Sequence, residues 1–159
     1  MPARYLPIYV NDHLFGVVGG VELCRRTMRE NESSELGVFL GSLLTSLEED
    51  RDSLLRLLRT LGIAPSRAKT AAAWTVEKLG RLKLNGELTR YSPLSRLLEL
   101  EGLASGIAAK EALWLALRQV QDCDERLAAF PLDELAARAR AQREQLEPHL
   151  HEAARAALG

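Results

Sequence analysis

Residues 36–61 read LGVFLGSLLTSLEEDRDSLLRLLRTL, and this stretch decides the fold. Leucines recur along it at steps of three, four or seven residues, which places them on one face of an α-helix. They are Leu36, Leu40, Leu43, Leu47, Leu54, Leu58 and Leu61. Charged residues fill much of the opposite face, namely Asp50, Asp52, Arg56 and Arg59. The pattern predicts a long amphipathic helix with one buried face.

The ends of this helix carry ordinary boundary signals. Ser33 or Ser34 can cap its start by accepting a hydrogen bond from a free backbone N–H. Gly62 favours a stop, and Pro65 prevents the helix from continuing. We therefore expect the helix to end at about residue 61.

The same signals predict further helices on both sides. Asn11 or Asp12 can cap a first helix that runs to about Glu30, preceded by an extended arm over residues 1–10. A shorter helix is expected near residues 66–84. Ser92-Pro93 predicts another start, because proline suits the first helical position. Pro131 opens the last helix, and Pro148 should kink it.

The expected fold is an all-α, antiparallel bundle of four long helices with one shorter helix and the N-terminal arm. The whole chain, residues 1–159, is expected to form one domain, because this length can bury a sizeable core. Abundant leucine, alanine, arginine and glutamate favour helices over sheets. The short connections favour antiparallel neighbours.

Glycines lie four residues apart in three of the expected long helices. The pairs are Gly16/Gly20, Gly37/Gly41 and Gly102/Gly106. A glycine inside a helix costs about 1 kcal/mol relative to alanine, so six at this spacing need a reason. Two glycines on one helix face let another backbone approach closely, or leave space for a ligand. We expect close helix contacts, in which Gly20→Leu or Gly106→Leu would overpack.

Composition and cysteine usage point to a cytoplasmic protein. No stretch approaches the roughly 18 consecutive apolar residues that a membrane span needs. The N-terminal residues do not resemble a signal peptide. Cys24 and Cys123 stand singly, with no CxxC or CxxH motif around them, so buried free thiols in a reducing compartment are expected rather than a disulfide. A net charge of −1 argues against strong nonspecific nucleic-acid binding by the whole surface.

Carboxylates recur near the middles of the long helices. Glu22 lies on the first, and Glu99 or Glu101 on the helix that follows Pro93. Glu48 and Glu49 lie on the second. In this order of helices the chain resembles the ferritin-like bundle superfamily. That superfamily places a Glu on each of two helices and Glu-x-x-His on each of the other two, and these residues bind two metal ions.

The resemblance does not extend to an intact ligand motif. Arg51 and Asp52 stand where a histidine would follow Glu48 or Glu49. On the last helix Glu144 is followed at that spacing by Glu147, while His149 and His151 lie nearby without completing the motif.

His149 has a second interpretation, as a residue of the apolar stripe on the last helix. That stripe steps by three and four residues and also includes Gln142. Buried polar groups need partners, so each is expected to be satisfied inside the bundle. A half-buried histidine beside a proline could also bind a ligand or titrate near neutral pH.

The segment from Arg67 to Arg96 is basic, with seven basic residues against two acidic ones. Such asymmetry is typical of a surface that meets phosphate or another anionic partner, and equally of a solvated helix face. Lys78, Arg81 and Lys83 are the expected contact residues for such a partner.

Two functions of different classes follow. The first is a non-catalytic helical bundle that acts through its surface, with a homodimer as the expected assembly and no cofactor. The resemblance implies the alternative, a metal-dependent oxidoreductase holding iron or manganese at a di-metal carboxylate site. Its ligands would come from Glu22, Glu48, Glu49, Glu101 and His149. The sequence contains no phosphate-binding glycine loop, and no His base lies near a candidate serine nucleophile.

Overall fold

The computed structural model describes residues 4–66 and 90–159, and all regular structure within these ranges is helical. The four long helices are α1 (Leu6–Glu30), α2 (Glu35–Leu61), α4 (Pro93–Gln119) and α5 (Leu132–Leu158). Two short 3-10 turns, η1 (Gln121–Cys123) and η2 (Glu125–Ala129), connect α4 to α5. The all-α prediction is confirmed for these ranges, which contain no strand.

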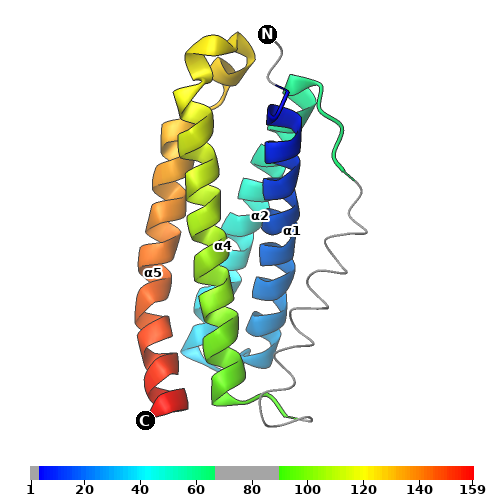
Figure 1. Cartoon of the computed structure of the whole chain (residues 1–159). Coiled ribbons are helices and arrows are strands. Elements are labelled where there is room, and N and C mark those ends of the chain that lie inside the picture. The colour runs from blue at the N-terminus through cyan, green and yellow to red at the C-terminus, as the bar shows by residue number, and fades with distance from the viewer. Residues whose placement is uncertain (1–3, 67–89) are drawn as a thin grey trace.

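The four long helices lie side by side (Figure 1). α1 packs against α2 and α4, and α4 packs against α5. At one end, Asn31 Nδ2 donates a hydrogen bond of 3.0 Å to Tyr91 Oη, so the residues before α4 lie beside the α1–α2 turn. At the other end, Arg126 Nη1 donates to the carbonyl oxygen of Leu61 at 3.0 Å, which places η2 beside the end of α2.

Three helix boundaries agree with their sequence signals. The Ser34 hydroxyl accepts a hydrogen bond from Gly37 N at 3.2 Å and caps α2. Gly62 ends that helix with a φ of 69°, a left-handed conformation that side chains disfavour. Ser92 caps α4 by accepting from Ser95 N at 3.1 Å, and Pro93 is the first residue of that helix.

The extended arm predicted for residues 1–10 is wrong over its second half, because α1 begins at Leu6. Pro7 is compatible with a helix start, where its missing N–H is not needed and its fixed φ is already helical. Asn11 is therefore inside the helix and does not cap it. Its side chain donates to Ala64 O at 3.2 Å and accepts from Ser66 N at 2.7 Å, which joins α1 to the chain after α2.

Two other predictions concern the short helix and Pro148. The shorter helix expected near residues 66–84 falls almost wholly outside the described residues. Pro148 lies inside α5, which continues as a helix on both sides of it.

The leucine stripe of α2 faces the core as expected. Leu40, Leu54 and Leu58 are fully buried there. In the described part of the chain, Trp114 of α4 is the largest of the fully buried side chains. Burial of each such large apolar side chain contributes about 1.5–3 kcal/mol to folding, so this core dominates the stability of the bundle.

The glycines make close contacts at some positions and not at others. A Cβ on Gly37 would lie 2.2 Å from the carbonyl oxygen of Asn31 in the α1–α2 turn. A Cβ on Gly102 would lie 3.1 Å from Leu23 Cδ2. By contrast, Gly20 and Gly106 have no atom within 4 Å of that position, and neither has Gly16.

A Cβ therefore fits at Gly20 and Gly106, whereas the overpacking predicted for Gly20→Leu and Gly106→Leu concerns a larger side chain and stays a prediction. These two glycines border a narrow cavity of about 20 Å³ between α1 and α4, whose lining includes Leu103, Ile107 and Lys110. A cavity of this size holds roughly one water molecule. Gly16 and Gly20 of α1 and Gly106 of α4 thus leave a narrow space, whereas Gly37 lies against backbone and Gly102 against Leu23.

Candidate functional site

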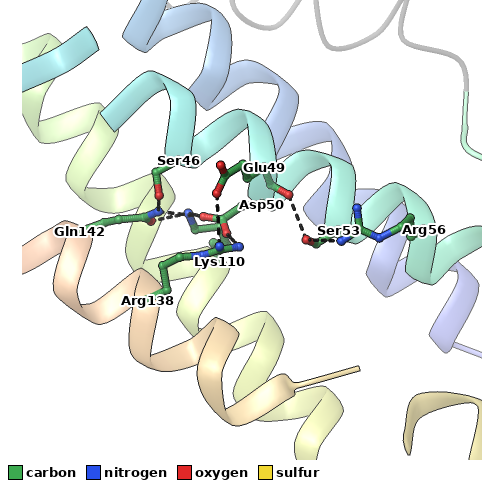
Figure 2. A network of polar contacts seen from close by, with 8 residues as sticks. All are labelled: Ser46, Glu49, Asp50, Ser53, Arg56, Lys110, Arg138 and Gln142. Atoms are coloured by element: carbon green, nitrogen blue, oxygen red, sulfur yellow. Dashed lines mark hydrogen bonds and ion pairs between the residues drawn. The ribbon is translucent and has the colours of Figure 1, made fainter. Parts of the chain in front are cut away.

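A cluster of buried polar side chains joins three helices (Figure 2). Asp50 comes from α2, Lys110 from α4 and Gln142 from α5, and their exposed fractions are 1%, 2% and 4%. Lys110 Nζ forms an ion pair with Asp50 and donates to Gln142 Oε1 at 2.5 Å. Gln142 Nε2 in turn donates to Asp50 Oδ2 at 2.9 Å and to Ser46 Oγ at 2.6 Å. The cluster is a closed network that holds a charge of each sign.

Arg138 of α5 forms the edge of this network. Its guanidinium pairs with the second carboxylate oxygen of Asp50, and it also lies 3.5 Å from Glu49 Oε2. Asp50 is thus held between a cation from α4 and a cation from α5, as Figure 2 shows.

Burial sets the electrostatics of the cluster. Loss of water lowers the pKa of Lys110, the Asp50 carboxylate opposes this by raising it, and Arg138 lowers it further. A buried ion pair repays its desolvation only when both members are present. The geometry therefore suits a structural charge pair whose members depend on each other.

The sequence prediction for Asp50 is wrong. Asp50 was assigned to the solvated face of the helix, yet it is almost fully buried. The signal was present in the spacing, because Leu47, Asp50 and Leu54 step by three and four along the buried stripe. The prediction that Gln142 lies on the buried face of its helix is confirmed. The burial of Lys110 was not predicted, although Lys110 lies three residues after Ile107 and so shares the buried face of α4.

A second buried carboxylate, Glu99, lies between α4 and α1. Its exposed fraction is 1%, and Arg26 Nε lies 3.5 Å from Glu99 Oε1. Burial raises the pKa of Glu99, while the nearby Tyr91 hydroxyl, the charge of Arg26 and the nearby Thr27 hydroxyl lower it. Within the described part of the chain, neither carboxylate oxygen of Glu99 has a hydrogen-bond partner. Burial and the Glu99 charge also raise the pKa of Tyr91.

Glu111 is the third buried acidic residue within the described ranges. Arg140 Nε donates to its Oε1 at 2.9 Å, and Arg143 Nη2 donates to its Oε2 at 3.3 Å. Each buried carboxylate in the described part of the chain therefore faces a lysine or an arginine. In this arrangement each carboxylate is neutralised separately by the basic side chains beside it.

Two of the predicted metal ligands, Glu22 and Glu48, are brought together by an arginine. Arg25 forms an ion pair with Glu22 on its own helix, and its Nη2 donates to Glu48 Oε1 at 2.6 Å. These hydrogen bonds and charges raise the pKa of Arg25. The contact is a partly exposed bridge from α1 to α2.

The other predicted ligands lie elsewhere. Glu49 meets Arg138 at the surface, and the His149 ring stacks on Phe39 with centroids 4.3 Å apart. Glu101 lines an open groove of about 570 Å³ between α4 and α5, together with Glu144, Glu147 and His151. Over residues 4–66 and 90–159, no three His, Cys, Asp or Glu side chains form a group that could hold a metal ion.

The two cysteines occupy different environments. Cys24 is buried, its Sγ lies 3.6 Å from the carbonyl oxygen of Leu40, and burial raises the pKa of its thiol to about 12. Cys123 is exposed. Both are free thiols, and the sequence prediction that they are buried is confirmed for Cys24 and wrong for Cys123.

Lys78, Arg81 and Lys83, the predicted contacts for an anionic partner, lie outside the described residues. Among the helices of the described ranges, none has the length and apolarity required to cross a membrane. No protein-family model matches the chain, and comparison with curated proteins and with solved structures finds no significant similarity.

Proposed function

We propose that this chain is a non-catalytic helical-bundle protein, ferritin-like in arrangement, that acts through its surface. The observation that carries the proposal is the pairing of Asp50, Glu99 and Glu111 with basic side chains. A di-metal site requires carboxylates that converge on one another, because the metal ions supply the positive charge. Here lysine and arginine already supply that charge.

The order of the helices supports the ferritin-like part of the proposal. α1 pairs with α2, α4 pairs with α5, and α1 also meets α4. α2 ends beside η2, whereas the chain enters α4 beside the α1–α2 turn. A ferritin-like bundle has antiparallel helix pairs and one long crossover between them, and this placement of the ends is compatible with both.

A second copy of the chain is the proposed partner, in a reducing, cytoplasmic compartment. The compartment is inferred from the two free thiols, one of which is exposed. Sedimentation of the purified protein at several concentrations tests the assembly. A sedimentation coefficient that stays at the monomer value at every concentration would exclude the homodimer.

Metal analysis of protein purified without chelators tests the non-catalytic assignment. We expect substoichiometric iron and manganese, and a melting temperature that does not change on addition of a chelator. Glu48→Ala serves as the diagnostic variant, and Glu152→Ala, at an exposed position on α5, serves as its control.

The alternative function predicts the opposite result. A metal-dependent oxidoreductase would retain near-stoichiometric iron or manganese, and Glu48→Ala would lose it while Glu152→Ala would not. That outcome would replace the non-catalytic proposal with a di-metal site that draws on Glu22, Glu48, Glu49, Glu101 and His149.

A further inference from the structure

At one end of the bundle α2 ends and the η turns connect α4 to α5 (Figure 1). A groove of about 770 Å³ opens there. We call it the end groove. Four parts of the chain line it: Tyr5 and Tyr9 at the start of α1, Leu61 at the end of α2, Leu117 and Val120 at the end of α4, and Leu127 of η2. The wall is therefore built from the ends of helices that the core holds in place.

The lining is apolar and carries no net charge. Among the lining residues in the described part of the chain, the only charged side chains are Asp124 and Arg126, and they neutralise each other. Arg126 Nη2 donates to Asp124 Oδ2 at 2.6 Å, and Arg126 Nε donates to Asp124 Oδ1 at 2.8 Å. Because these two charges are paired with each other, neither is free to bind an ionic ligand. A neutral apolar ligand would leave the pair undisturbed.

Exposed apolar side chains gather at the same end. Tyr5 is 71% exposed and Val120 is 41% exposed, and both line the end groove. Ile8 and Leu115 are also exposed, and each is adjacent in sequence to a lining residue. Small-molecule sites have volumes of about 300–1,000 Å³ and mostly apolar linings with a few polar groups, and the end groove fits this description.

We propose that the end groove binds a neutral, largely apolar small molecule. The two tyrosines supply flat aromatic walls with hydroxyl groups, and the aliphatic side chains of α2 and α4 supply the rest of the contact surface. This inference is independent of the proposed surface role, because it needs neither a protein partner nor a metal.

A neutral fluorescent probe, N-phenyl-1-naphthylamine, tests the proposal on the intact chain. We expect a saturable rise in fluorescence with one probe per chain. Val120→Asp should weaken binding by about tenfold or more, because it places a carboxylate in an apolar site. Val38→Asp is the matched control, since Val38 is exposed on α2 and does not line the groove. It should bind the probe as the wild type does.

Cys123 provides a second readout that needs no substitution. It lines the end groove and is exposed, while Cys24 is buried, so in the folded protein a thiol reagent should modify Cys123 first. Saturating probe should slow the reaction of Cys123 with dithiobis(nitrobenzoate) several-fold. Prior modification with N-ethylmaleimide should weaken probe binding. This readout decides the question if Val120→Asp does not fold.

Three results would overturn the proposal. The first is the absence of saturable probe binding, and the second is equal binding by Val120→Asp and Val38→Asp with no protection of Cys123. The third is a wild-type dimer that Val120→Asp converts into a folded monomer. It would show that a second copy of the chain covers the end groove.

Discussion

Gly37 and Gly106 are both helical glycines, but their surroundings are opposite. A side chain on Gly37 would enter the backbone of the α1–α2 turn, whereas a side chain on Gly106 would meet open space. Sequence spacing alone cannot separate these cases, because both belong to pairs with the same four-residue separation. The difference depends on which atoms of the rest of the fold lie opposite each glycine.

Alanine substitutions should therefore change stability in opposite directions. We expect Gly106→Ala to raise the free energy of unfolding by about 0.4–1 kcal/mol, because alanine restricts the unfolded chain and fits the helix. Gly37→Ala should lower it by about 1–3 kcal/mol through overpacking against Asn31 O. Urea denaturation of the two variants measures both. A stability gain in Gly37→Ala would contradict the close contact.

The raised pKa of Glu99 should make the stability of the protein depend on pH. Its pKa is raised above the ordinary value of 4.5 in the folded protein, with Arg26, Glu30 and Tyr91 as its charged and titratable neighbours. The unfolded state therefore loses its proton first, and stability falls as the pH rises from about 4.5 to the raised pKa. Each unit of this shift corresponds to about 1.4 kcal/mol.

Glu99→Gln should remove this dependence. The variant should match the wild type at pH 4 and exceed its stability at neutral pH, because position 99 then carries no ionised carboxylate. Denaturant titrations at several pH values measure the difference, and Glu101→Gln, an exposed neighbour on α4, is the control. Parallel pH curves for wild type and Glu99→Gln would contradict the predicted effect of burial.

At the scale of the helices, boundaries were predictable and buried charges were not. Ser34, Gly62 and Ser92-Pro93 act through hydrogen bonds or backbone angles within a few residues, so the sequence displays them directly. Asp50 is buried only because Lys110 and Arg138 arrive from other helices. The sequence prediction placed Asp50 outside because an unpaired charge belongs in water, although its spacing from Leu47 and Leu54 falls on the buried stripe. The start of α1 was missed because its prolines also suit an extended chain.

Substitutions at Asp50 of α2 and Lys110 of α4 should have strongly coupled effects on the free energy of unfolding. Lys110→Met leaves the buried carboxylate with Arg138 as its one paired cation, and we expect a loss of about 3–5 kcal/mol. Asp50→Asn should also destabilise, since it leaves the lysine ammonium buried. The double variant removes both charges, so its loss should be smaller than the sum of the two single losses. Denaturant unfolding of the four proteins measures the coupling, and strict additivity would contradict it.

At the scale of the whole molecule, charge is unevenly distributed along the chain. The Arg67–Arg96 segment has seven basic residues and two acidic ones, although the chain as a whole has a net charge of −1. This asymmetry leaves two interpretations, an anionic partner or a solvated face. Lys78, Arg81 and Lys83 fall near the end of a helix predicted from sequence, where the helix dipole favours cations without any ligand. Charge alone therefore does not distinguish them.

Replacing Arg81 and Lys83 with glutamine separates the two interpretations. If the segment meets an anionic partner, the double variant should elute from a heparin column at lower salt than the wild type, with a nearly unchanged melting temperature. The interaction should weaken as salt is added, because exposed charges are screened within about 10 Å at 0.1 M. Arg59→Gln with Arg155→Gln removes the same charge from exposed positions on α2 and α5 and controls for net charge. Equal elution of the two double variants would mean that the basic segment contributes only its charge, as a solvated face does.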